Sequence, residues 1–355
     1  MTTEALAEAM RGGVPVTALA PMQDVTTLPF MRLLADARYG APDFFVTEFL
    51  RVHATSIIDE DIRECLENPP AETPLFLQLI GEDVPALVRV AREALSRFDV
   101  AGIDLNLGCP APKVFRKNVG GGLLRDLPHV AEILPALREV CSEFGGRFTL
   151  KCRLGFDDAG ALAPLLDLAR ENAVDWIAVH GRTVRGLYRT PVDYDAIAAA
   201  VRDAACPVLA NGEISSVEKA LRVREKTRCA GWMIGRHAIR NPWIFRQLRE
   251  TREGAGTPFS PRLGDVFDYV RALADVVALP GDRPERVAAR MKKFLNFVGT
   301  GADAEGAFLH AVRRAGTPDE IFAIAERFLL AGGNAEKPFP AEPFPGLVAR
   351  PNCEA

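Results

Sequence analysis

DLNLGCPAPKVFRKNVGGG, residues 104–122, is the stretch that decides how the rest of the chain is interpreted. It starts in the apolar run GIDLNLG (102–108), which has the length and composition of a strand buried on both faces. Cys109, three basic residues and three glycines follow, and then comes the helical pattern HVAEILPALREVCSEF (129–144). The stretch therefore predicts a strand, a loop with chemically active residues, and a helix.

The same strand–helix unit recurs along the chain. Short apolar or alternating runs lie at 16–22, 43–49, 75–81, 102–108, 148–154, 176–182, 207–213 and 231–236. Helical patterns separate them, such as DVPALVRVAREALSRF (83–98), where Asp83 is a candidate N-cap and Pro85 lies in the first turn. Eight such units favour an α/β fold of the (β/α)8 TIM-barrel type. A doubly wound sheet is the alternative, but the first strand ends in APMQDV, without its GxGxxG fingerprint.

The pattern changes after the last apolar run, and this predicts the domain organisation. Residues 1–252 form the barrel, ending in a helix at 243–251, and EGAGTPFSPRLG within 253–264 has the composition of a linker. Residues 265–335 carry only helical patterns and are expected to form a small helical domain. The remaining segment, 336–355, is proline-rich and is expected to be an irregular tail.

Bulk composition narrows the class of protein. The net charge of −4 over 355 residues gives no global signal for nucleic acid, so any such contact needs a local basic patch. The seven cysteines form no CxxC pair, which argues against a disulfide framework and against a metal site and fits a cytoplasmic protein. The sequence contains neither a signal-peptide pattern nor an apolar run long enough to span a membrane.

Polar residues collect at the ends of the predicted strands, where barrel enzymes place their chemistry. One polar residue at a strand end is ordinarily a solvated rim residue, and a lone histidine is more often structural than catalytic. That explanation has to be repeated for strand after strand here, which weakens it. These polar residues and their neighbours, in chain order, are Met22, Gln23, Gln78, Asn106, Cys109, Lys151, Arg153, His180, Gly181, Arg182, Asn211, Gly212, Glu213, Gly235 and Arg236.

The last two strand ends favour a phosphate site. Asn211-Gly212 and Gly235-Arg236 put flexible backbone and an arginine where the seventh and eighth loops of such barrels bind phosphate. A phosphate together with Lys151, Gln78 and a histidine suggests flavin mononucleotide (FMN), because a lysine stabilises the reduced ring and an amide can pair with its pyrimidine edge. In the absence of a nicotinamide fingerprint, NADPH or NADH is expected to bind only transiently.

At this point the motifs resemble those of the tRNA-dihydrouridine synthases. The matching stretches are APM (20–22), TEFLRV (47–52), LQLIG (77–81), residues 104–124, LKCRLG (150–155), VHGRT (179–183), ANGEI (210–214) and MIGRHAIRNPWIF (233–245). The resemblance implies an FMN-dependent oxidoreductase that reduces the C5=C6 bond of uridine in tRNA, with the helical region as a tRNA-binding domain. It implies that FMN is held by Pro21, Met22, Gln23, Gln78, Lys151, His180, Asn211, Gly212, Glu213, Gly235 and Arg236.

The resemblance also implies roles on the substrate side. Cys109 looks like the proton donor, and Asn106, Arg153 and Tyr188 look like residues that hold the target uridine or nearby tRNA. TEFLRV, with Arg51, is most similar to the subfamily that acts on uridine 16 of the D-loop. The loop at 106–122 is closer to the general bacterial type, so uridine 20 stays open beside uridine 16.

A proton-donor role explains why a thiol lies in such a loop. An ordinary thiol is mostly protonated near neutral pH and can donate to a base that is stacked on the flavin. The glycines 120–122 are expected to let the loop open and close, and Lys113, Arg116 and Lys117 to meet the RNA backbone. The alternatives are a packing role for Cys109 and, for the basic helix RPERVAARMKKF (283–294), a solvated surface instead of phosphate contact.

Two other functions compete with this one. A dihydroorotate- or dihydropyrimidine-dehydrogenase-like FMN enzyme would act on free pyrimidines, but the basic cysteine loop and the added helical domain argue against it. A non-enzymatic tRNA-binding factor would need no flavin, so a colourless purified protein would favour it.

Overall fold

The computed structural model describes residues 1–254 and 256–349. The chain divides into two compact units, each described here by itself. The first comprises Met1–Leu28, Pro42–Ile214 and Lys219–Gly235, and the second comprises Pro29–Ala41, Ser215–Glu218 and the chain from Arg236 onward. The βα pattern of the sequence places the barrel boundary at 252, whereas the contacts group the helices that follow Gly235 with the second unit.

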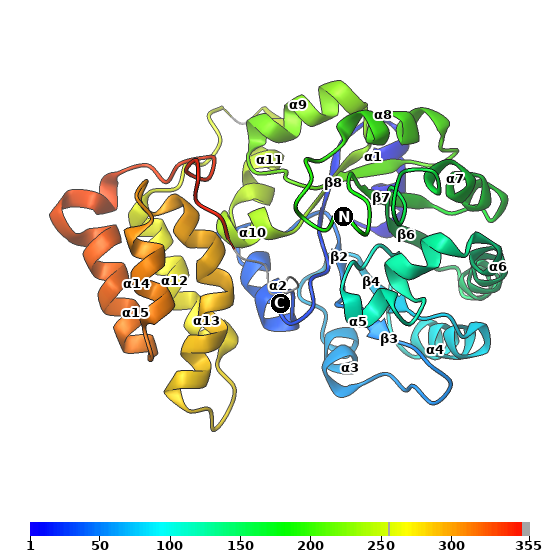
Figure 1. The fold of residues 1–355 in the computed structure, drawn as a ribbon, viewed down its shortest axis with the longest axis horizontal. Coiled ribbons are helices and arrows are strands. Elements are labelled where there is room, and N and C mark those ends of the chain that lie inside the picture. Colours follow the sequence, from blue (N-terminus) through cyan, green and yellow to red (C-terminus); the bar gives the residue numbers. More distant parts are fainter. Residues whose placement is uncertain (255, 350–355) are drawn as a thin grey trace. The chain divides into compact units, whose positions relative to one another are not determined.

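The first unit is a barrel of parallel strands (Figure 1). Neighbouring strands follow the order β1-β9-β8-β7-β6-β5-β4-β2, and β3 pairs with β4 beyond the end of β2. A parallel bridge between Ala18 and Phe44 joins β1 to the start of β2 and closes the ring. The strands are β1 (Val16–Leu19), β2 (Phe45–Val46), β3 (Leu50–Arg51), β4 (Leu75–Ile80), β5 (Gly102–Leu107), β6 (Arg147–Arg153), β7 (Trp176–His180), β8 (Val208–Asn211) and β9 (Gly231–Ile234). The (β/α)8 prediction is confirmed, and the doubly wound alternative is excluded because its sheet is open.

Buried hydrogen bonds between Thr17 and Asp43 support this closure. The Asp43 carboxylate accepts hydrogen bonds from the backbone N–H of Thr17 at 2.8 Å and from its hydroxyl at 2.9 Å. The backbone N–H of Asp43 donates in return to the Thr17 hydroxyl oxygen at 3.1 Å. Polar groups where the first and second strands meet are thereby satisfied without water.

Helices cover the outside of the barrel in the expected order. In Figure 1 α4, α6, α7 and α8 lie side by side around the strands. The Asp83 carboxylate accepts from the backbone N–H of Ala86 at 2.9 Å, which confirms the N-cap. The helices of this unit are α1 (Thr3–Arg11), α3 (Glu60–Glu67), α4 (Val84–Arg97), α5 (Pro112–Phe115), η1 (Gly120–Arg125), α6 (Leu127–Glu143), α7 (Leu162–Glu171), α8 (Tyr194–Asp203) and α9 (Val217–Thr227).

An apolar cluster fills the barrel at the amino ends of its strands. Phe44, Phe76 and Trp176 contact one another edge to face, with ring centroids 5.1 to 5.6 Å apart. Leu6 and Met10 of α1 belong to the same buried cluster. This end of the barrel is therefore a packed floor, and chemistry is confined to the opposite end.

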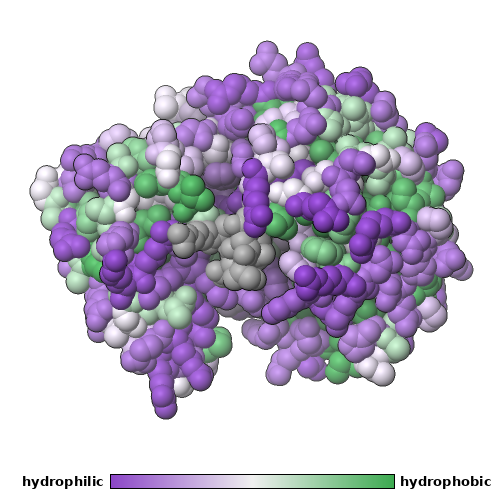
Figure 2. Space-filling model, viewed as in Figure 1, coloured by the Kyte–Doolittle hydropathy of each residue, from purple (hydrophilic) through white to green (hydrophobic). Residues whose placement is uncertain are grey.

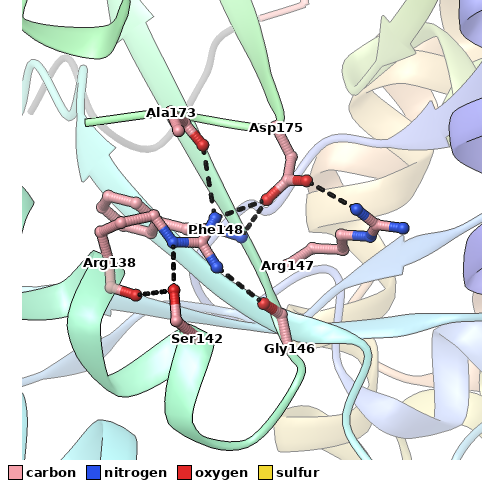
Figure 3. A network of polar contacts seen from close by, with 7 residues as sticks. All are labelled: Arg138, Ser142, Gly146, Arg147, Phe148, Ala173 and Asp175. Atoms are coloured by element: carbon pink, nitrogen blue, oxygen red, sulfur yellow. Dashed lines mark hydrogen bonds and ion pairs between the residues drawn. The ribbon is translucent and has the colours of Figure 1, made fainter. Parts of the chain in front are cut away.

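A polar network ties β6, β7 and α6 together (Figure 3). The Asp175 carboxylate, just before β7, accepts from Arg138 at 2.9 Å, from Arg147 at 2.9 Å and from the backbone N–H of Phe148 at 2.8 Å. Arg138 also donates to the backbone carbonyl of Gly146 at 3.1 Å. The network therefore fixes how α6 and two neighbouring strands meet.

The second unit is helical. Its helices are α2 (Leu28–Ala35), α10 (Arg236–Arg240), α11 (Ile244–Glu253), α12 (Leu263–Val277), α13 (Pro284–Val298), η2 (Gly299–Gly301), α14 (Ala307–Arg314), α15 (Pro318–Ala325), η3 (Glu326–Leu330) and η4 (Ala331–Glu336). The residues predicted as helical within 265–335 therefore do form helices. Phe30 of α2 packs on Phe294 of α13, with ring centroids 5.2 Å apart, so a segment from early in the chain contributes to this core.

The proline-rich segment after η4 has little regular structure but is pinned in place. The buried Arg240 guanidinium donates to the carbonyls of Pro340, Ala341 and Glu342 at 2.6 to 3.0 Å and lies over the ring of Phe339. The prediction of an irregular tail also covers residues 350–355, which lie outside the described residues, as does residue 255 of the predicted linker.

The described surface is mainly polar. Hydrophilic residues predominate on the face shown in Figure 2, and the hydrophobic patches between them are small. Among residues 1–254 and 256–349, no helix combines the length and apolar content needed to cross a membrane.

Candidate active site

The interior faces of the strands change from apolar to polar along their length. Residues two apart on a strand share a face. On β4, Phe76 is followed on that face by Gln78, and on β8 Leu209 is followed by Asn211. On β7, Trp176 lies at the start and His180 at the end. The carboxyl ends of the strands thus form a polar mouth above the apolar floor.

Strand β6 contributes two cations to this mouth. Lys151 is in register with Asn106 of β5, and Arg153 is in register with His180 of β7. Burial lowers the pKa of Lys151 to about 8. The positive charge of Arg153 also lowers this pKa, and the negative charge of Asp104 opposes the shift. The half-buried Lys151 therefore keeps its positive charge near neutral pH.

A chain of side-chain hydrogen bonds leads from the barrel interior to Cys109. The Asn106 side-chain oxygen accepts from the backbone N–H groups of Gly108 at 3.0 Å and Cys109 at 2.9 Å. The Asn106 amide group donates to the Gln78 side-chain oxygen at 2.8 Å. The Gln78 amide group in turn donates to the Asp104 carboxylate at 2.7 Å. The backbone that carries the half-buried Cys109 is thereby fixed to the strands.

The three glycines after Cys109 differ from the expected exposed hinge. Gly120, Gly121 and Gly122 are buried in η1. A Cβ on Gly120 would lie 2.7 Å from the Ile80 side chain, and Gly120 has a φ of +57°. Glycine is required here for close packing and a left-handed backbone, and not for an open, mobile loop.

Arg153 is engaged by protein atoms. It is 2 % exposed, and its guanidinium donates to the carbonyls of Gly108 at 3.0 Å, Thr183 at 2.9 Å and Leu187 at 2.8 Å. It also lies over the ring of Tyr188, 5.2 Å from the centroid. Arg153 therefore organises the loops after β5 and β7, and these bonds compete with the expected contact between Arg153 and RNA.

The predicted phosphate end combines glycines with polar groups. The Asn211 amide group donates to the Met233 carbonyl at 2.7 Å, and Gly212 has a φ of +118°. The Glu213 carboxylate pairs with the buried Arg182 guanidinium, so that side chain is already engaged. Gly235 packs closely, because a Cβ there would lie 3.1 Å from the Met22 sulfur. Arg236 is the first residue of α10 and belongs to the second unit.

Other predicted residues lie on the surface. Lys113, Arg116 and Lys117, in or just after α5, are exposed, as are Arg51 of β3 and Gln23 in the turn after β1. Lys113, Arg116 and Lys117 lie four to eight residues after Cys109 in the chain, so the segment that follows the cysteine carries exposed positive charge. This arrangement suits a polyanion that approaches the mouth.

Four residues of this region carry no predicted role. Asp104 and Thr149 are buried polar residues on the interior face of β5 and β6, and Arg182 binds Glu213. Burial raises the pKa of Glu48, after β2, to about 7. Asp104 could have been predicted from the sequence, because it lies two residues before Asn106 and therefore shares the same face of β5.

The residues at the mouth fit a flavin phosphate. A protonated lysine, two side-chain amides and a histidine converge from β4, β6, β7 and β8, and glycines follow β8 and β9. Such a donor set suits the polar edge of a flavin and a phosphate.

Comparison with known proteins agrees with this geometry. A family profile described as "Dihydrouridine synthase (Dus)" matches residues 18–298. The chain belongs to the dihydrouridine synthase family. Family members include a probable tRNA-dihydrouridine synthase of Helicobacter pylori strain J99, 38% identical over 234 residues that cover 65% of this chain and 69% of that protein. Proteins named tRNA-dihydrouridine synthase B are also similar: 38% identity in Pseudomonas aeruginosa (68% of this chain and 72% of that protein), and 37% in Pseudomonas putida (74% and 77%). The chain is thus an oxidoreductase of this family.

Proposed function

We propose that this protein reduces the C5=C6 bond of uridine in tRNA to 5,6-dihydrouridine, with FMN as cofactor and NADPH or NADH as electron donor. Membership of the family supports the reaction class. The observation that carries the proposal is the buried hydrogen-bond chain that fixes the backbone of Cys109 to the strands β4 and β5, in register with the lysine of β6.

The residues proposed to hold FMN come from the strand ends. The flavin, when bound, supplies the hydride for C6 of the uracil. Lys151 offers a positive charge to the ring, and Gln78 keeps one amide hydrogen beyond its bond to Asp104. The full proposed set is Pro21, Met22, Gln23, Gln78, Lys151, His180, Asn211, Gly212, Glu213, Gly235 and Arg236, with Glu213 acting through its backbone because its carboxylate binds Arg182.

Cys109 is the proposed acid. Reduction at C6 leaves negative charge at C5 and on the C4 carbonyl, so a proton has to reach C5. Asn106 accepts one hydrogen bond from the backbone N–H of Gly108 and one from that of Cys109, which limits the positions that the thiol can take. A fixed donor loses less entropy when the substrate arrives.

The proposed tRNA contacts are Arg51, Asn106, Lys113, Arg116, Lys117, Arg153 and Tyr188, with Arg153 acting through the loops that it holds because three carbonyls engage its guanidinium. The exposed cations Lys113, Arg116 and Lys117 are suited to phosphates. The uridine has to leave the RNA stack before it reaches the mouth, at a cost of a few kcal/mol. Within the D-loop we favour uridine 16, with uridine 20 as the alternative.

The test uses Cys109→Ala, with Cys206→Ala as the matched control because Cys206 is also half-buried. Cys109→Ala should keep FMN and tRNA binding but saturate uridine about a hundredfold to ten thousandfold more slowly, the usual contribution of general acid catalysis. Mass-spectrometric mapping of dihydrouridine in tRNA gives the rate and the position, and free uridine is a parallel substrate. Wild-type rates in Cys109→Ala would reject the donor role, and activity on free uridine without tRNA would reject the substrate.

A further inference from the structure

Asp104 is a carboxylate placed deep inside the barrel. It is 2 % exposed, and both its oxygens accept hydrogen bonds: one from the Gln78 amide group at 2.7 Å and one from the Thr149 hydroxyl at 2.6 Å. The three residues form one row, because Gln78, Asp104 and Thr149 are in register across β4, β5 and β6. Burying a carboxylate is costly, and the groups around Asp104 offset that cost with two donors.

The hydrogen-bond chain that ends at Asp104 has a direction. Backbone N–H groups can only donate, so those of Gly108 and Cys109 require the oxygen of Asn106. The amide group of Asn106 then faces Gln78 and takes its oxygen. The amide group of Gln78 consequently needs an acceptor, and Asp104 provides it. An acceptor oxygen at position 104 thus completes the chain at its buried end, and the side chain of Asp104 supplies it.

We propose that Asp104 is a positioning residue for Cys109 and acts through the side-chain amides of Gln78 and Asn106. It fixes the orientation of both amides, and Asn106 then holds the turn at residues 108–109. The reaction served by this turn rests on the proposed function, in which Cys109 gives a proton to the base. The hydrogen-bond chain itself is independent of that function.

A different role for Asp104 is to supply negative charge near Lys151. Two substitutions separate the roles. Asp104→Asn keeps an oxygen for Gln78 and turns its amide group toward the Thr149 hydroxyl, so the chain survives while the charge is lost. Asp104→Ala removes both. Thr149→Val is the matched control, because it removes the second bond to Asp104 but leaves the chain to Cys109 intact.

The first readout is amide hydrogen exchange in the full-length, FMN-free protein. We expect the N–H groups of Gly108 and Cys109 to exchange about tenfold faster in Asp104→Ala, the equivalent of roughly one lost hydrogen bond. Asp104→Asn and Thr149→Val should remain within about twofold of wild type. Helix α13, in the second unit, serves as an internal reference and should not change. Equal acceleration in Asp104→Ala and Asp104→Asn, or none in Asp104→Ala, overturns the proposal.

The second readout separates the two half-reactions of the loaded enzyme. In Asp104→Ala, saturation of uridine in tRNA should slow by about tenfold, clearly more than the reduction of bound FMN by NADPH, which Gln78 also serves, and Asp104→Asn should restore it. A merely structural role would slow both half-reactions by the same factor, and a charge role would leave Asp104→Asn as impaired as Asp104→Ala. Either pattern contradicts the proposal.

A wild-type measurement covers the case in which Asp104→Ala does not fold. The side-chain amide hydrogens of Gln78 and Asn106 that bond within the chain should exchange slowly in nuclear magnetic resonance spectra, at least tenfold below exposed amides. Exchange as fast as that of exposed amides would overturn the proposal. These exchange measurements need neither FMN nor tRNA, so failure of the proposed function and failure of this inference are distinguishable.

Discussion

Replacement of Asp175 by alanine tests what holds the barrel together beneath the site (Figure 3). The carboxylate accepts three hydrogen bonds: from Arg138, from Arg147 and from the backbone N–H of Phe148. Its side chain is 15% exposed, and those of Arg138 and Arg147 are 21% and 28% exposed. Breaking a fully buried ion pair costs about 3–5 kcal/mol, so at this partial exposure we expect Asp175→Ala to lower the free energy of unfolding by about 2–3 kcal/mol.

The assay is urea unfolding of the FMN-free chain, followed by circular dichroism. Asp175→Asn keeps an oxygen for the Phe148 N–H and should cost about 1 kcal/mol less than alanine. Asp167→Asn is the control, because Asp167 also pairs with an arginine but is 57% exposed. That change should stay within about 0.5 kcal/mol of wild type. If Asp175→Ala is as mild as Asp167→Asn, the assigned role of the network is wrong.

Three further predictions concern pH and packing. Since Lys151 loses its proton near pH 8, FMN should bind roughly tenfold more weakly as pH rises from 7 to 9.5. Lys151→Met should bind FMN weakly at every pH. Flavin-fluorescence titrations that show a flat wild-type profile would contradict this. Burial raises the pKa of Glu48 from its usual 4.5 to about 7, so the folded state holds this proton to higher pH than the unfolded state and stability should fall between pH 4.5 and 7. Glu48→Gln should remove this component, about 3 kcal/mol at pH 8; an unchanged difference between unfolding at pH 5 and pH 8 would refute it. Gly120→Ala should lower the free energy of unfolding by at least about 1 kcal/mol more than Gly145→Ala does. Both glycines have positive φ, but only a Cβ at Gly120 would press against Ile80. Equal unfolding free energies for the two variants would contradict the packing explanation.

The barrel was predictable because its units repeat. Every strand that the sequence indicated is present, since a parallel strand needs a long crossover and leaves a regular apolar rhythm. Contacts between distant segments were not predictable. Helix α2 packs its Phe30 on Phe294 of α13, and no periodicity in residues 28–35 indicates that partner. The split of the second strand into β2 and β3 likewise depends on how each piece pairs with β4.

The site was predictable in location and less so in the connections between its residues. Residues such as Gln78, Lys151 and Asn211 were found because the carboxyl ends of parallel strands meet at one end of a barrel. The sequence could not show that the Arg153 guanidinium donates hydrogen bonds to three backbone carbonyls, because those carbonyls belong to loops that follow other strands. The sequence also could not show that the nitrogen of the Gln78 amide faces Asp104, because this orientation depends on the distant backbone N–H groups of Gly108 and Cys109.

The apolar floor and the polar mouth depend on each other. Thr149 is in register with Trp176, so the row that holds Asp104 runs directly into the aromatic cluster of Phe44, Phe76 and Trp176. Asp104 is 2 % exposed there, and its two oxygens accept from Gln78 and Thr149, so protein donors define its position. Burial also lowers the pKa of Lys151, one row closer to the mouth, to about 8. A wetter floor would leave the carboxylate and the amides free to exchange partners with water, and the turn that carries the thiol would lose its fixed support.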